Sequence, residues 1–202
     1  MLLYIRPSYN SRFLFTRATR KAARIRAFRH RKVILRDGIV RPNAVVPVLT
    51  ANAAGQPCAV PMAWGWSVPR LDGKQGRMRV YTVPCRLLLT ESPAEHRCAV
   101  LCNGFTPDDT SSGKPDSRNL RRFSNRDTHF WACGIFRIQN HIPSFLICVD
   151  TDSTGSSMKP VMLSTEDMLR WISKGCIPGL TAGSGSMVAG QSMHDGSACT
   201  VK

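Results

Sequence analysis

The chain of 202 residues has room for one domain of ordinary size with extensions, and its composition, 43% hydrophobic and 20% charged, is typical of a globular protein. No apolar stretch approaches the roughly 18 residues that a membrane-spanning helix needs, which argues against a transmembrane protein. The net charge of +15 is unevenly spread: eleven Lys and Arg and no acidic residue precede Asp37, whereas 17 Lys and Arg face 13 Asp and Glu from there onward.

The first predicted element is an amphipathic helix with a cationic side in the basic segment 12–36. An Arg-rich, acid-free, amphipathic N-terminus is typical of a mitochondrial transit peptide, which predicts the mitochondrial matrix. A compatible interpretation is an arm that remains on the mature protein and neutralises RNA phosphates, and a third is a solvated charge run without a partner. The residues expected on phosphates are Arg24, Arg26, Arg29, Arg31, Lys32 and Arg36.

From residue 39 the pattern changes to short apolar runs separated by polar segments rich in Gly, Pro, Asp and Ser. Such runs predict strands joined by turns, and therefore an antiparallel sheet. The predicted strands cover 45–49, 58–66, 78–83, 98–105, 129–138 and 145–150.

One helix is predicted near the end of the chain, where Ser164 or Thr165 caps a first turn containing Glu166 and Asp167. The apolar face behind this turn includes Trp171. Strands with few helices predict the α+β class. The domain organisation expected is a basic N-terminal extension over 1–36, one domain over 37–174 and a flexible Gly/Ser-rich tail over 175–202.

The eight cysteines do not follow the spacing of a metal site, because no C-x-x-C pair is present. Disulfides are not expected either, since no secretory leader with a clean apolar region precedes the domain. Reduced, mostly buried thiols are the favoured interpretation over structural zinc. No metal or cofactor is expected.

The order of segments resembles the SRAP family, the SOS-response-associated peptidase fold of abasic-site sensor proteins. Ala63-Trp64-Gly65-Trp66 with Pro69 is similar to its W-G-[YL]-x-P signature, and Met78-Arg79-Val80-Tyr81-Thr82 to N-A-R-x-E-T. The resemblance spans about 41–173 and implies an antiparallel, β-barrel-like core. The other segments in the family's order are Arg41–Asn43 with Val46–Leu49, Ala99–Phe105, Lys114–Pro115, Phe130–Phe136, Phe145–Val149, Lys159–Leu163 and the helix with Trp171.

The groups that the resemblance implies for catalysis are not retained. Active members expose a cysteine once the initiator Met is removed, whereas the second residue here is Leu2; the similar segment Tyr9–Phe13 has Asn10 at that place. An asparagine offers neither a thiolate nor a free amine. The chain is therefore predicted to be a pseudoenzyme. The family's asparagine, its two acids and its histidine correspond to Arg77, Tyr81, Pro107 and Ser156.

A nucleic-acid surface is expected to survive this loss. Arg79 matches an arginine that in the family lies near the DNA backbone, and Arg77 adds a second charge beside it. Trp66 and Arg70 lie in a segment similar to the family's aromatic wedge loop and could stack on an unpaired base, although core packing is the alternative for Trp66. A basic loop over 106–128 is a second phosphate site or a solvated face; its residues of interest are Arg118, Arg121 and Arg122.

The function predicted from these features is that of a non-catalytic, SRAP-like RNA-binding protein in a mitochondrial ribonucleoprotein, with the ribosome favoured and rRNA and neighbouring proteins as partners. The rival hypothesis is a SRAP-type protein that crosslinks or processes abasic single-stranded DNA through an unusual nucleophile such as Cys102. A third is a free DNA- or RNA-binding module.

Overall fold

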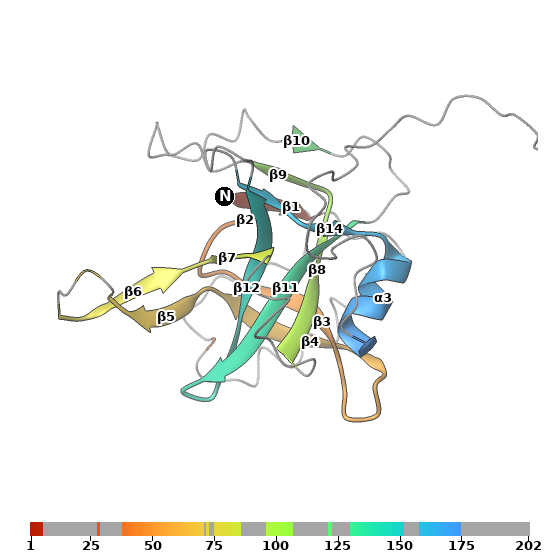
Figure 1. The fold of residues 1–202 in the computed structure, drawn as a ribbon, viewed down its shortest axis with the longest axis horizontal. Coiled ribbons are helices and arrows are strands. Elements are labelled where there is room, and N and C mark those ends of the chain that lie inside the picture. The colour runs from red at the N-terminus through yellow and green to blue at the C-terminus, as the bar shows by residue number, and fades with distance from the viewer. Residues whose placement is uncertain are drawn as a thin grey trace, which may run out of the picture.

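The computed structural model describes residues 1–5, 28, 38–70, 72, 75–85, 96–106, 121–122, 130–151 and 158–174. Within these ranges the chain forms fourteen strands and one helix, α3, which packs on one side of the strands (Figure 1). The described residues contain no helix with the length and apolar character needed to span a bilayer.

A small antiparallel sheet holds the first residues of the chain within the fold. Its strand order is β10-β9-β1-β2, so β1 is hydrogen-bonded on both sides. The side chains of Leu3 and Ile5 in β1 are fully buried. β1 lies inside the range 1–36 that was predicted to be an extension, and it contributes to the core. The strand bounds are β1 Leu2–Ile5, β2 Gly38–Val40, β9 Gly104–Thr106 and β10 Arg121–Arg122.

The large sheet has the order β13-β12-β4-β3-β8-β11-β14, with β7 attached to β12. It is mixed, because β12 pairs in parallel with β4 and β7 but antiparallel with β11 and β13. The extra pairing of β12 with β11 makes the sheet curl back on itself. The bounds are β3 Val45–Ala51, β4 Pro57–Trp64, β7 Thr82–Pro84, β8 Arg97–Cys102, β11 Phe130–Gln139, β12 Ile142–Thr151, β13 Met158–Pro160 and β14 Met162–Leu163.

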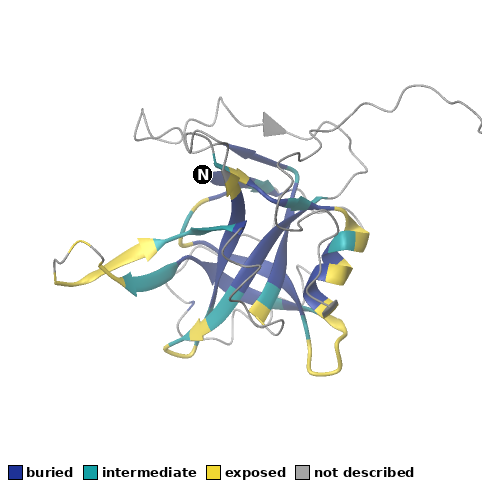
Figure 2. Ribbon diagram, in the orientation of Figure 1, coloured by how far each residue is buried: buried dark blue, intermediate teal, exposed yellow. Residues whose placement is uncertain are grey.

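A two-stranded hairpin of β5 (Trp66–Pro69) and β6 (Arg77–Val80) projects from the sheets. Figure 2 shows it as half-buried and exposed along its length, in contrast to the buried strands behind it. Gly65 separates β4 from β5 and adopts φ 112°, a backbone conformation that L side chains rarely take. The hairpin therefore leaves the large sheet at a position that glycine makes possible.

The helix α3 (Thr165–Lys174) confirms the prediction near the end of the chain. Ser164 is the cap, since the Asp167 N–H donates to Ser164 Oγ at 3.1 Å. Trp171 is buried against the sheet, and its Nε1 donates to the carbonyls of Cys98 at 3.0 Å and Gly134 at 3.2 Å. The capped end and the buried apolar face are what the sequence pattern indicated.

The core lies between the curled sheet, the small sheet and α3. Its largest fully buried side chain is that of Trp64, which stacks on Phe145 with ring centroids 6.3 Å apart. Burying side chains of this size contributes on the order of 1.5–3 kcal/mol each relative to leaving them in water. The described cysteines in this core are free thiols.

The predicted class was wrong. The described residues are mostly strand with a single helix, so the fold is all-β in character rather than α+β, and it consists of mixed and antiparallel sheets instead of an antiparallel barrel. The error has a physical cause: the many short strands pair over long sequence distances, which local periodicity does not reveal. Each predicted strand segment does contain one or two strands, whereas β1, β2, β10, β13 and β14 were not predicted.

Candidate functional site

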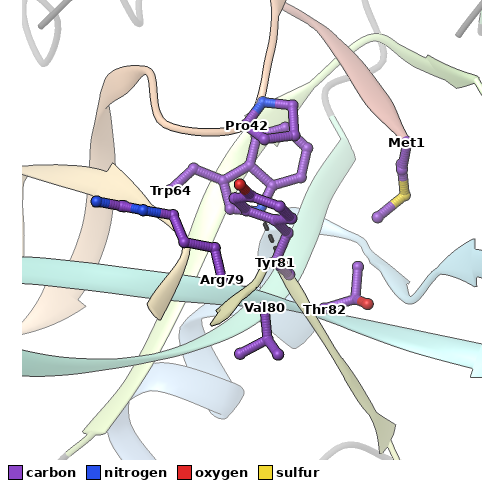
Figure 3. A pocket seen from close by; sticks show the side chains of 7 residues that line it. All are labelled: Met1, Pro42, Trp64, Arg79, Val80, Tyr81 and Thr82. Carbon is purple, nitrogen blue, oxygen red and sulfur yellow. Dashed lines mark hydrogen bonds between the residues drawn. The ribbon is translucent and has the colours of Figure 1, made fainter. Parts of the chain in front are cut away.

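A pocket of about 390 Å³ opens where the hairpin meets the two sheets (Figure 3). Its walls come from segments that are far apart in the sequence: the start of β1, the turn after β2, the end of β4, and the stretch from β6 into β7. The described residues that line it are Met1, Pro42, Trp64, Arg79, Val80, Tyr81 and Thr82.

Aromatic side chains form a rigid part of the wall. The indole Nε1 of Trp64 donates to the carbonyl of Tyr81 at 2.8 Å, which fixes the indole in its plane. The Tyr81 ring lies against Gly65, so that a Cβ added at Gly65 would stand 2.6 Å from two ring carbons. The Tyr81 hydroxyl accepts a hydrogen bond from Asn43 Nδ2 at 3.3 Å. The wall is therefore held in place before any ligand binds.

The N-terminal residue approaches the pocket from the other side. Met1 is buried, and the following N–H of Leu2 donates to Thr106 Oγ1 at 3.0 Å. In Figure 3 the Met1 side chain and the Arg79 side chain lie on opposite sides of the aromatic group. Met1 was not predicted to lie here; the apolar run Leu2–Ile5 before the basic segment was the available signal.

The side chains around the pocket suit binding better than proton transfer. Among the described lining residues, Arg79 has the charged side chain and Tyr81 a hydroxyl that accepts from Asn43, and none is a carboxylate, an imidazole or a thiol. General acid–base catalysis most often uses a histidine or a carboxylate within about 3 Å of the reacting atom. A guanidinium beside aromatic rings is instead suited to bind a ligand in which a negatively charged group is attached to a planar ring system.

The structure separates the four described residues that were predicted to contact nucleic acid. Arg79 lines the pocket. Arg77 and Trp66 lie on the same hairpin but are not among the lining residues, and Arg70 is exposed and paired with Asp72, its Nε donating to Oδ1 at 3.0 Å. Trp66 is half-buried under Arg137. It is therefore partly packed and partly exposed, which lies between the core-packing and base-stacking roles considered for it.

The remaining predicted contact residues fall outside the described part of the chain. Arg121 and Arg122 form β10, but their side chains are not among those described. The others outside the described residues are Arg24, Arg26, Arg29, Arg31, Lys32, Arg36 and Arg118.

Arg137 and Gln139 are functional candidates that were not predicted from the sequence. Both lie at the end of β11 and reach the hairpin, where Arg137 stacks over Trp66 with its guanidinium carbon 4.0 Å from the ring centroid. No local pattern indicates this partnership, because the two residues are joined only by the pairing of distant strands.

Four of the described thiols are made unreactive by burial. Cys102 is fully buried, and desolvation raises its pKa to about 12, although hydrogen bonds from the backbone act in the opposite direction. Desolvation likewise raises the pKa of Cys85 to about 12 and those of Cys98 and Cys148 well above the ordinary range. A thiol in this state is a poor nucleophile near neutral pH. No cluster of three or more His, Cys, Asp or Glu suited to a metal ion occurs among the described residues.

Comparison with known proteins identifies a similar fold and no family. No protein-family model matches the chain, and no curated protein does. A solved structure of a phage-related protein from Bordetella bronchiseptica, a structural-genomics target, is similar with a TM-score of 0.51 and 10% sequence identity. The match covers 85% of this chain and 81% of that chain. The chain therefore shares the fold of this phage-related protein, and at such identity the likeness extends to the fold alone.

Proposed function

We propose that this chain is a non-catalytic RNA-binding protein with a SRAP-like fold, built into a mitochondrial ribonucleoprotein, with the ribosome as the favoured assembly. The observation that carries the proposal is the lining of the pocket, where Arg79 stands beside the half-buried Tyr81, whose carbonyl accepts a hydrogen bond from the fully buried Trp64. No carboxylic acid, imidazole or thiol accompanies them among the described lining residues. Such a pocket can hold a phosphate and an adjoining base, and its described lining offers no carboxylate, imidazole or thiol for catalysis.

The charge distribution supports a polyanionic partner. Eleven Lys and Arg without an acidic residue precede Asp37. Keeping this many like charges in one segment costs free energy because the charges repel one another. Binding to phosphate groups relieves this repulsion and releases the counterions that surround the nucleic acid. Sequence segments in the order of the SRAP family support the SRAP-like assignment, and the basic amphipathic N-terminus supports the mitochondrial one.

The first experiment measures binding of the full chain to a fluorescent single-stranded RNA by anisotropy at several salt concentrations. We expect the logarithm of affinity to fall linearly with the logarithm of salt concentration, and Arg79→Gln to reduce the magnitude of the slope by about one. Arg170→Gln is the matched control, because Arg170 is an exposed arginine on α3 that pairs with Glu166. An absence of RNA binding at low salt would contradict the proposal, as would equal behaviour of the two variants.

A second experiment addresses the assembly. The protein carrying a C-terminal tag in its native cells is expected to sediment with ribosomal RNA in a gradient of mitochondrial lysate. Recovery of the protein only as free material without RNA would exclude the structural role in a ribonucleoprotein.

The non-catalytic part is tested against the abasic-site hypothesis. The burial and raised pKa of Cys102 speak against this thiol as a nucleophile. Incubation with single-stranded DNA containing an abasic site is therefore expected to give no denaturant-resistant adduct. A stable adduct, at Cys102 or at the N-terminus, would show that the chain retains covalent chemistry.

A further inference from the structure

A second cationic site lies on the hairpin beside the pocket. It consists of Arg77 on β6, Arg137 on β11 and the side chains that hold them, Trp66, Ser67 and Gln139; we name this the Arg77–Arg137 cluster. The hairpin that carries it projects from the sheets and is half-buried to exposed (Figure 2). None of these five residues is among the described residues that line the pocket.

Arg77 is fixed by hydrogen bonds to a single neighbour. Its Nε donates to Ser67 Oγ at 2.8 Å and its Nη2 to the Ser67 carbonyl at 2.7 Å. Gln139 Nε2 donates to the same carbonyl at 3.0 Å, and Gln139 Oε1 accepts from the Ser67 N–H at 3.1 Å. The end of β11 and the guanidinium of Arg77 therefore converge on one carbonyl oxygen.

Arg137 is fixed by an aromatic face. Its guanidinium carbon lies 4.0 Å from the centroid of the Trp66 ring. The ring itself is anchored, because Trp66 Nε1 donates at 3.0 Å to the carbonyl of Ser144, the residue that pairs with Arg137 in the sheet. A stacked guanidinium keeps its edge available for an anion.

The cluster holds two positive charges without an acidic partner among the described residues. No described carboxylate pairs with Arg77 or Arg137, whereas Arg70 pairs with Asp72 and Arg170 with Glu166 and Asp167. Burial and the charge of Arg77 together lower the pKa of Arg137. Moreover, Arg137 Nε is buried and makes no hydrogen bond within the part of the chain that the structure describes. A buried donor without an acceptor beside a like charge is costly, and negative oxygens bound at the exposed part of the guanidinium would offset the like charge.

We propose that the Arg77–Arg137 cluster binds a phosphate group of an RNA strand whose neighbouring nucleotide occupies the pocket. Ser67 accepts from Nε and Nη2 of Arg77, and Nε of Arg137 is buried, so each guanidinium offers its remaining Nη hydrogens to a phosphate. Arg77 and Arg79 are two residues apart on β6, so they lie on the same face of the hairpin, about 7 Å apart along the strand. One strand of RNA can thus contact the pocket through Arg79 and the cluster through Arg77. This inference rests on the proposed RNA binding.

The test compares variants of the full chain in the anisotropy assay, with a single-stranded RNA as the probe. Arg77→Gln and Arg137→Gln are each expected to weaken binding by about tenfold or more, as the loss of a charge-assisted hydrogen bond does, and to reduce the salt slope by about one. Arg137→Lys retains the charge and is expected to retain the slope while losing part of the affinity. Arg170→Gln serves as the control for a lost surface arginine.

A footprint on the unmutated protein keeps the inference testable if a variant fails to fold. Phenylglyoxal modifies accessible arginines, and mass spectrometry locates the products. We expect RNA to protect Arg77 and Arg137 and to leave Arg170 as reactive as in the free protein.

The outcomes separate the inference from the function on which it rests. If RNA binds and Arg79→Gln weakens it, but Arg77→Gln and Arg137→Gln behave like Arg170→Gln, the cluster is not a phosphate site and the proposed function stands. If the wild-type protein binds no RNA, both fail. If poly-glutamate binds in a manner that depends on Arg137 and RNA does not, the partner is an acidic protein and the inference is overturned.

Discussion

At the scale of single residues, burial decides which thiols can react. Cys58 is half-buried, whereas Cys85, Cys98, Cys102 and Cys148 are buried and have raised pKa values. With an alkylating reagent at pH 7.5 we expect Cys58 to react at least about tenfold faster than these four, because the thiolate is the nucleophile. Raising the pH to 9 leaves Cys85 and Cys102 protonated, since their pKa values are about 12.

The measurement is site-resolved mass spectrometry of the native protein, with unfolding in urea as the control that makes every thiol reactive. Alkylation of native Cys102 at the rate of Cys58 would contradict the burial of Cys102. The raised pKa values also determine how stability depends on pH. Above the ordinary pKa of a thiol, the unfolded chain loses protons that the folded chain keeps, so the free energy of unfolding falls as pH rises toward about 12.

At the scale of elements, the junction between β4 and β5 positions the pocket. Gly65 has φ 112° and lies against the Tyr81 ring, whereas Gly55, in the turn between β3 and β4, has φ 73° and open space around it. We expect Gly55→Ala to cost about 1–2 kcal/mol from backbone strain alone. Gly65→Ala adds a clash at 2.6 Å and is expected to cost more, and to displace Tyr81 from the pocket.

Urea unfolding of the two variants gives the free energies, and RNA anisotropy reports on the pocket. Gly55→Ala is the matched control, since both glycines have positive φ and only one has a neighbour in the way. Equal losses of stability, with RNA binding unchanged in Gly65→Ala, would show that the contact with Tyr81 does not shape the site.

At the scale of the whole molecule, the first five residues are part of the fold. β1 bridges β2 and β9, and removing it takes a hydrogen-bonded partner from both. Leu3→Ala is therefore expected to lower the free energy of unfolding by about 2–5 kcal/mol, whereas Met78→Ala on the exposed side of the hairpin is expected to change it by less than about 0.5 kcal/mol. Urea unfolding of both variants tests this.

The position of β1 in the sheet also leads to a prediction about proteolytic cleavage of the N-terminal segment. If residues 1–36 were removed after import, β1 would be removed with them, so we expect the mature protein to retain Leu2–Ile5. Mass spectrometry of the N-terminus of the native protein decides the matter. A mature, folded protein that begins after residue 36 would contradict the role assigned to β1.

Sequence pattern was a good guide where the structure depends on neighbouring residues. The cap at Ser164 and the buried face of α3 follow from a few adjacent positions, and the runs from Val45 and Phe130 were recognised as strands because apolar residues alternate with turn signals there. The class and the arrangement of the sheets were misjudged because the short strands pair over long sequence distances, which local periodicity does not reveal. β1 was overlooked because its short apolar run adjoins a much stronger basic pattern.

The sequence by itself determined the uneven charge, the strand-rich middle and the capped helix. These properties depend on residue identity and short-range periodicity. Only the tertiary structure decided that Met1 meets Arg79 and Tyr81 around one pocket and that Arg137 stacks on Trp66 beside Arg77. These contacts form because strands far apart in the chain pair with one another, and the local pattern of a strand does not indicate which partner it takes.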